Sequence, residues 1–142
     1  MKETEFRVDI ERLEGYDFKV SFRDIEETLL MSEPAPLGSG KHPFGGHAIA
    51  AAIGHCMCSA LIFCLEKARV NTGLIKAVLF TKVERNEKGR LRLTKVRVSV
   101  HAQVDDMEKA RRCMEIFEDY CIVTQSIRQG IEVETEVIPS EL

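Results

Sequence analysis

Residues 48–65 of the chain read AIAAAIGHCMCSALIFCL, an apolar stretch without a charged side chain, and this stretch decides the fold. It predicts one long helix that begins near Gly46 or His47 and ends near Ala68, because Gly73 follows where helices commonly stop. Its length approaches the roughly 20 apolar residues of a membrane span. We nevertheless expect no membrane partner. A helix that is apolar on all sides, in a chain with amphipathic strands, is expected to be a core helix.

The rest of the composition fits one globular domain over residues 1–142, with 44% hydrophobic and 30% charged residues. The net charge of -3 comes from interspersed acidic and basic residues, which favours neither nucleic acid nor an anionic membrane as a partner. The N-terminal residues alternate charged and apolar types and lack a signal peptide, so we expect a cytoplasmic protein. Five cysteines in that compartment predict free thiols, a metal site or a catalytic redox pair.

Strand patterns lie on both sides of the predicted helix. Apolar and polar residues alternate in residues 4–12 and 18–23, which predicts a hairpin, and residues 25–31 are a candidate third strand. After the helix, residues 74–84 and 91–104 are long runs rich in Val, Leu and Thr that predict a second hairpin. The proline- and glycine-rich residues 32–46 predict a loop. A helix should follow Asp106, a shorter one should end at Gly130, and residues 131–137 alternate as a final strand.

This order predicts the α+β class, with antiparallel sheets packed around a long buried central helix. A single chain of 142 residues has little surface with which to cover a helix that is apolar all round. We therefore expect a homodimer in which the central helices are buried between the subunits.

The central helix carries Cys56, Cys58 and Cys64. Cys56 and Cys58 point about 200° apart on a helix, so one site can use only one of them. Cys64 lies on roughly the same face as Cys56 but about 12 Å further along the axis. Cys58 and Cys64 are expected to pack as small hydrophobic residues, as most buried cysteines do. Cys121, in the C-terminal stretch, decides whether Cys56 is functional.

Histidines and cysteines supply enough donors for a zinc ion, among them His42, His47 and His55. Structural zinc normally uses closely spaced pairs, and the sequence has no Cys-x2-Cys or His-x3-His pair. The sequence therefore predicts neither a metal nor another cofactor.

Two motifs of the chain resemble motifs of the OsmC/Ohr family of stress-related thiol proteins. The first is the AIGHC motif of residues 52–56, which follows a proline-containing loop at the start of a long alanine-rich helix. The second is Cys121 followed by the GIEV motif of residues 130–133. The predicted order of strands and helices is also that of the family, so the resemblance covers most of the chain.

The resemblance implies the OsmC-like fold, an intertwined homodimer and a thiol-dependent peroxidase that reduces organic hydroperoxides. Cys56 would attack a small hydrophobic peroxide and become a sulfenic acid. Cys121 would resolve it as a disulfide, which an external dithiol then reduces.

The family's peroxidases carry a Pro-Glu pair at the helix start, whose glutamate works with an N-terminal arginine to activate the thiol. Here these positions are Gly45 and Gly46. A thiol this deep in an apolar helix needs a nearby cation. The candidates for supporting the thiolate are two histidines and two arginines, namely His47, His55, Arg12 and Arg23.

Cys121 also departs from the family, which commonly has proline after this cysteine where this chain has Ile122. Asp119 can cap a helix whose first turn contains Cys121, which would make Cys121 the more reactive sulfur. The alternative to a peroxidase is a non-catalytic dimer of the same fold that binds a small hydrophobic ligand at the subunit interface.

Overall fold

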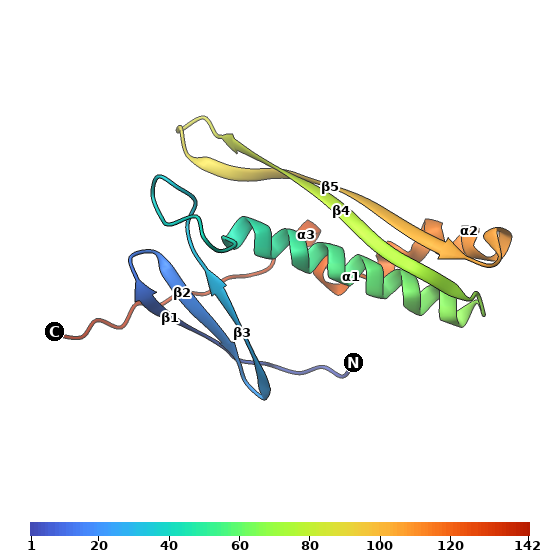
Figure 1. The fold of residues 1–142 in the computed structure, drawn as a ribbon, viewed down its shortest axis with the longest axis horizontal. Helices are drawn as coiled ribbons and strands as arrows, with labels where there is room; N and C mark the ends of the chain where they lie inside the picture. Colours follow the sequence, from blue (N-terminus) through green and yellow to red (C-terminus); the bar gives the residue numbers. More distant parts are fainter. The chain divides into compact units, whose positions relative to one another are not determined.

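The computed structural model describes residues 1–142 and has the α+β order that the sequence predicts (Figure 1). The elements in chain order are β1 (Val8–Glu14), β2 (Asp17–Phe22), β3 (Ile25–Met31), α1 (Gly45–Lys67), β4 (Thr72–Arg85), β5 (Leu91–Val104), α2 (Met107–Ile116), the 3-10 helix η1 (Phe117–Tyr120) and α3 (Ile122–Gln129). Two compact units can be distinguished. One contains Met1–Ala51 and Phe80–Arg97, and the other contains Ala52–Leu79 and Val98–Leu142.

The first unit contains the three-stranded antiparallel sheet β1-β2-β3. Ile10 of β1 pairs with Val20 of β2, and the Val20 side chain is buried. Gly15 makes the turn between these strands with a φ of 55°, a conformation that glycine adopts without a steric cost. Ser32, buried after β3, anchors the following loop because its hydroxyl accepts the N–H of His42 at 2.8 Å.

The second unit contains the main apolar core, in which α1 packs with α2 and β5. Leu61, Leu65 and Val70 are buried there together with Ala110 of α2. Gly54 of α1 lies so close to β4 that an added Cβ would be 2.7 Å from Cδ1 of Leu79. The glycine in the middle of this helix therefore permits close contact between helix and strand.

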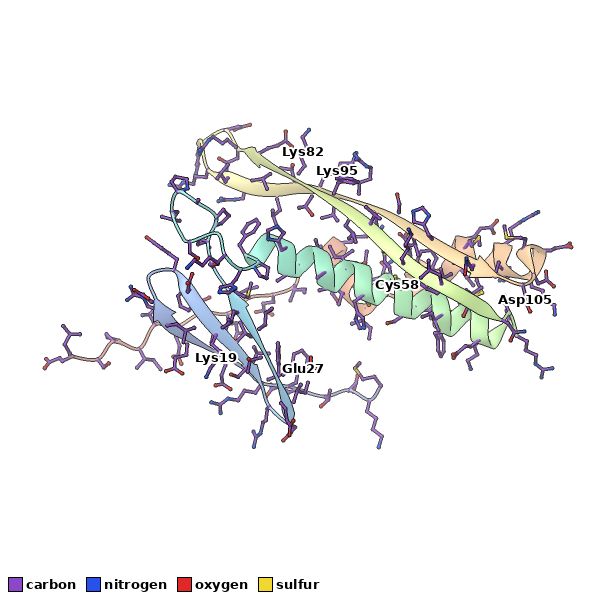
Figure 2. The ribbon with its side chains drawn as sticks, in the orientation of Figure 1. Lys19, Glu27, Cys58, Lys82, Lys95 and Asp105 are labelled. Atoms are coloured by element: carbon purple, nitrogen blue, oxygen red, sulfur yellow. A yellow bond between two sulfur atoms is a disulfide. The ribbon has the colours of Figure 1, made fainter.

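Short polar contacts fix the ends of the elements in this unit. Asp105, labelled in Figure 2, accepts hydrogen bonds from the backbone N–H of Asn71 at 3.0 Å and from its side-chain amide at 2.7 Å. These bonds, the side-chain one first, lower the pKa of Asp105. Asp106 caps α2 through the N–H of Lys109, and Gly130 ends α3 with a φ of 76°, as predicted.

The predicted strand over residues 131–137 is wrong for this chain, because residues 130–142 adopt no regular secondary structure. The alternation is present in the sequence, yet Val133 and Val137 are 82% and 85% exposed. A strand exists only by pairing with a neighbour. The two sheets, β1-β2-β3 and β4-β5, do not include this segment.

Cys64 does not pack as a free thiol, as the sequence suggested, but forms a disulfide with Cys113. The bond joins α1 to α2, with 5.6 Å between the two Cα atoms and a sequence separation of 49 residues. Its partners lie on different helices, so helical spacing within one segment could not reveal the pairing. Cys58, labelled in Figure 2, stays free, and burial raises its pKa.

Helix α1 is long and apolar enough to cross a membrane by length and composition alone, with a mean hydropathy of 2.1 in its most apolar window. The core helix of a soluble protein meets the same criteria. Only 33% of that window is buried within the chain. Among residues 48–65 the exposed ones are Ala51, Ala52, His55, Ser59 and Phe63, so part of this apolar helix lacks a cover within the chain.

Replacing both disulfide cysteines, as Cys64→Ala with Cys113→Ala, should lower the free energy of unfolding by about 2–4 kcal/mol, because the closed loop restricts the unfolded chain. Urea unfolding followed by circular dichroism would measure the loss. Cys58→Ala is the matched control, since it removes a thiol of the same helix without opening a loop. Equal stability of the double variant and the control would show that the bond contributes nothing.

Candidate thiol site

The structure brings Cys56 and Cys121 together, although 65 residues separate them in the sequence. Cys56 lies in the middle of α1 and is half-buried, whereas Cys121 directly precedes α3 and is fully buried. The Sγ atom of Cys56 accepts the backbone N–H of Val123 at 3.5 Å. Both cysteines belong to the same compact unit. The fold therefore places these two cysteines next to each other.

The start of α3 supplies the donors that reach Cys56. Cys121 is the extended N-cap residue, with φ -82° and ψ 99°, so the chain turns into the helix immediately after it. The first N–H groups of a helix have no partner inside the helix. Here the N–H groups of Ile122 and Val123 are directed to the Cys56 sulfur. The positive end of the α3 dipole also favours a negative charge at this place.

Two opposing influences act on the Cys56 thiol, and the net result is a raised pKa. Burial contributes most, because it disfavours the charged form. The backbone N–H of Val123 lowers the pKa, and that of Ile122 does so more weakly. The hydrogen bond and the charge of Cys121 raise it again. Cys56 is therefore held mainly as a thiol at neutral pH, beside donors that would stabilise its thiolate.

Cys121 is positioned differently from the prediction that Asp119 caps its helix. Asp119 lies inside η1, which ends at Cys121 with a bond from the Cys121 N–H to the carbonyl of Glu118 at 3.0 Å. Cys121 itself is the N-cap residue of α3. The Cys121 thiol donates to the Oγ1 atom of Thr124 at 3.0 Å. Thr124 is buried, and the sequence analysis missed it. Thr124 stands three residues after the N-cap residue Cys121, and this spacing was the sequence signal for a contact between the two side chains.

The two histidines proposed to support the thiolate have different surroundings. The Nδ1 atom of His47 accepts the N–H of Phe44 at 3.2 Å, and the two rings meet edge to face with 4.8 Å between centroids. His47 thus helps to fix the entrance of α1. His55 is adjacent to Cys56 in sequence but exposed. Neither histidine is among the groups that shift the Cys56 pKa.

The two candidate arginines lie in the unit that does not contain Cys56. Arg12 donates from Nε to the carbonyl of Gly15 at 2.8 Å, which secures the first turn. Arg23 is exposed after β2. The pKa of Asp9 is lowered mainly by its hydrogen bond with Arg7, and the charge of Arg23 adds to this effect. Support of the Cys56 thiolate by Arg12, Arg23, His47 or His55 therefore stays a prediction.

No group of three or more histidine, cysteine, aspartate and glutamate side chains converges on one point. His42 lies in the loop anchored by Ser32, in the unit without Cys56.

The fold and the paired cysteines define a class of α+β proteins in which a thiol of the central helix meets the start of a late short helix. Residues 38–136 match the family model described as OsmC-like protein. The chain belongs to this family. No curated protein sequence matches it.

Solved structures agree with this assignment at the level of the fold. An OsmC-like protein of unknown function from Vibrio cholerae has a TM-score of 0.76 at 14% identity, covering 87% of this chain and 94% of its own. An OsmC-like protein from Mycoplasma pneumoniae gives 0.71 at 9% identity, with 92% and 91% covered. An organic hydroperoxide resistance protein from Elizabethkingia anophelis gives 0.66 at 20% identity, with 92% and 94% covered.

The substitution Val123→Pro tests the role of the α3 donors, because proline lacks an N–H and is tolerated in the first turn of a helix. Losing a group that lowers the Cys56 pKa should move the pH profile of alkylation by iodoacetamide to higher pH. The rate of alkylation at pH 8 should fall about threefold to tenfold, which corresponds to the free energy of one hydrogen bond. Cys56 would be followed by mass spectrometry, and Val123→Ala is the control that keeps the N–H. An unchanged profile for Val123→Pro would show that the bond does not stabilise the thiolate.

Proposed function

We propose that the protein is a thiol-dependent peroxidase for organic hydroperoxides, with Cys56 and Cys121 as its redox pair. The main observation behind this proposal is that the Cys56 sulfur lies against the first N–H groups of α3, directly beside Cys121. Membership of the OsmC-like family supports the proposal. So does the fold shared with a protein named for organic hydroperoxide resistance.

The reaction uses three steps. The Cys56 thiolate attacks the terminal oxygen of a hydroperoxide, so that an S–O bond forms, the O–O bond breaks, and the alkoxide takes a proton and leaves as an alcohol. Cys56 is oxidised to a sulfenic acid. The Cys121 sulfur then attacks it, and the hydroxyl leaves with the Cys121 proton as water. An external dithiol reduces the resulting disulfide and becomes a disulfide itself.

The first step needs a thiolate, whereas the surroundings raise the Cys56 pKa. The α3 donors supply part of the stabilisation. Gly46 stands where the family's peroxidases have an activating glutamate, so the remaining part must come from another group. We propose an arginine of the first sheet, Arg12 or Arg23, for this role. His47 and His55 remain the alternatives.

A peroxide assay with the full chain tests the pair. With cumene hydroperoxide and excess dithiothreitol, Cys56→Ser should abolish consumption. In a separate peroxide treatment without dithiothreitol, Cys121→Ser should leave a sulfenic acid at Cys56 that a dimedone probe labels, because the resolving sulfur is gone. Cys58→Ser, on the opposite side of α1, is the matched control and should behave as the unmodified protein. Consumption that persists in Cys56→Ser would exclude the proposed attacking residue.

The raised Cys56 pKa also favours a second candidate, a non-catalytic dimer that binds a small hydrophobic ligand at the subunit interface. A neutral buried thiol acts as a small apolar lining group. The same peroxide assay separates the two functions. Unchanged labelling of Cys56 and Cys121 after peroxide treatment would support the binding protein and contradict the peroxidase.

We propose that the protein acts as a homodimer in the cytoplasm, with neither nucleic acid nor a membrane as partner. Two features of the chain support the dimer. Ala52, His55 and Ser59 are exposed at helical spacing and form one uncovered face of α1. The strand-like residues 131–137 have no partner strand, which fits pairing with a second copy.

Ser59→Arg should convert the dimer to a monomer, because it places a long charged side chain in the middle of the uncovered α1 face. Sedimentation velocity would measure the change. Glu87→Arg introduces the same side chain in the exposed turn between β4 and β5 and should leave the dimer intact. A monomeric unmodified protein, or a dimeric Ser59→Arg variant, would contradict this arrangement.

A further inference from the structure

A cavity lies in the compact unit that also contains Cys56 and Cys121. Its volume is about 550 Å³, and neither Cys56 nor Cys121 lines it. It opens between the end of α1 and the face of α2, and the Cys64–Cys113 disulfide forms part of its wall. Cavities that hold small organic molecules commonly have volumes of about 300–1,000 Å³.

The charged side chains that line this cavity all have the same sign. Lys67 comes from α1, and Lys109 and Arg112 come from α2, whereas no acidic residue takes part in the lining. None of the three is in an ion pair, since the ion pairs of the chain involve other residues. Three like charges around one cavity repel one another. An anion between them would relieve this repulsion.

The remaining wall of the cavity is apolar. Phe63, Ile116 and Tyr120 line it together with the disulfide, and Phe63 and Tyr120 are about half exposed. The rings of Phe63 and Tyr120 lie 6.1 Å apart, and the Nζ atom of Lys67 lies 5.4 Å from the centre of the Phe63 ring. A cationic edge thus adjoins an aromatic surface. This combination suits a molecule with an anionic head and an apolar chain better than it suits an inorganic anion.

We propose that this cavity binds an amphipathic organic anion, a medium-chain carboxylate. The carboxylate lies against Lys67, Lys109 and Arg112, and the hydrocarbon chain lies against Phe63, Ile116 and Tyr120. The disulfide holds together the two helices that carry these groups. The site is separate from the Cys56 and Cys121 pair and does not require the peroxidase reaction.

Calorimetric titration of the full chain with octanoate, below its micelle concentration and without reductant, tests the proposal. Octanoate should bind saturably and about tenfold or more tighter than octylammonium, which has the opposite charge, or acetate, which lacks the chain. The octanoate affinity should fall as sodium chloride increases, because the cations are exposed to solvent. Equal binding of octylammonium would overturn the anion site, and equal binding of acetate would overturn its apolar part.

Variants locate the site independently of the ligand series. Lys109→Gln with Arg112→Gln should weaken octanoate binding about tenfold, while Lys88→Gln, an exposed lysine of the β4–β5 turn, should leave it unchanged. Circular dichroism would confirm that each variant folds. Unchanged affinity of the double variant would overturn the site. So would binding to vesicles of anionic lipid without binding of monomeric octanoate.

Discussion

The whole structure depends on covering the apolar surface of α1. Helix α1 has 23 residues, and only its last turn carries a charged side chain pair, Glu66 and Lys67. Burial of such surface drives folding in proportion to the apolar area removed from water. The chain covers one side with β4, β5 and α2, and Gly54 lets β4 approach closely. The exposed face that includes His55 and Ser59 has no cover within the chain, and it is the basis of the proposed homodimer.

The same burial determines the chemistry available to Cys56. A central helix removes a thiol from water and so raises its pKa, which opposes reactivity. The start of α3 acts in the other direction through the N–H groups of Ile122 and Val123. The proposed redox pair therefore depends on packing, because α3 docks where its unpaired N–H donors meet the Cys56 sulfur. The surroundings of the Cys56 sulfur depend on how closely α3 is held, and the Thr124 hydroxyl accepts a hydrogen bond from Cys121 at that junction.

Most elements could be predicted from local patterns, because each pattern reflects forces within a few residues. β3 and β5 have the predicted bounds, and α1 differs by one residue at each end. The match of residues 38–136 confirms the family inferred from the motifs around Cys56 and Cys121. The strand at residues 131–137 was predicted wrongly, because alternation indicates that a segment can pair and not that a partner is present. The Asp119 cap failed because a 3-10 turn intervened.

The sequence by itself determined the apolar helix, the strands beside it and the α+β class, since hydrophobic periodicity is a local property of the chain. Only the tertiary structure decided which sulfurs meet. Cys56 reaches the N-terminus of α3, and Cys64, on the same helix, bonds to Cys113 instead. Helical spacing places both cysteines on roughly one face of α1. Their partners come from distant segments, and the docking of α2 and α3 alone determines where those segments lie.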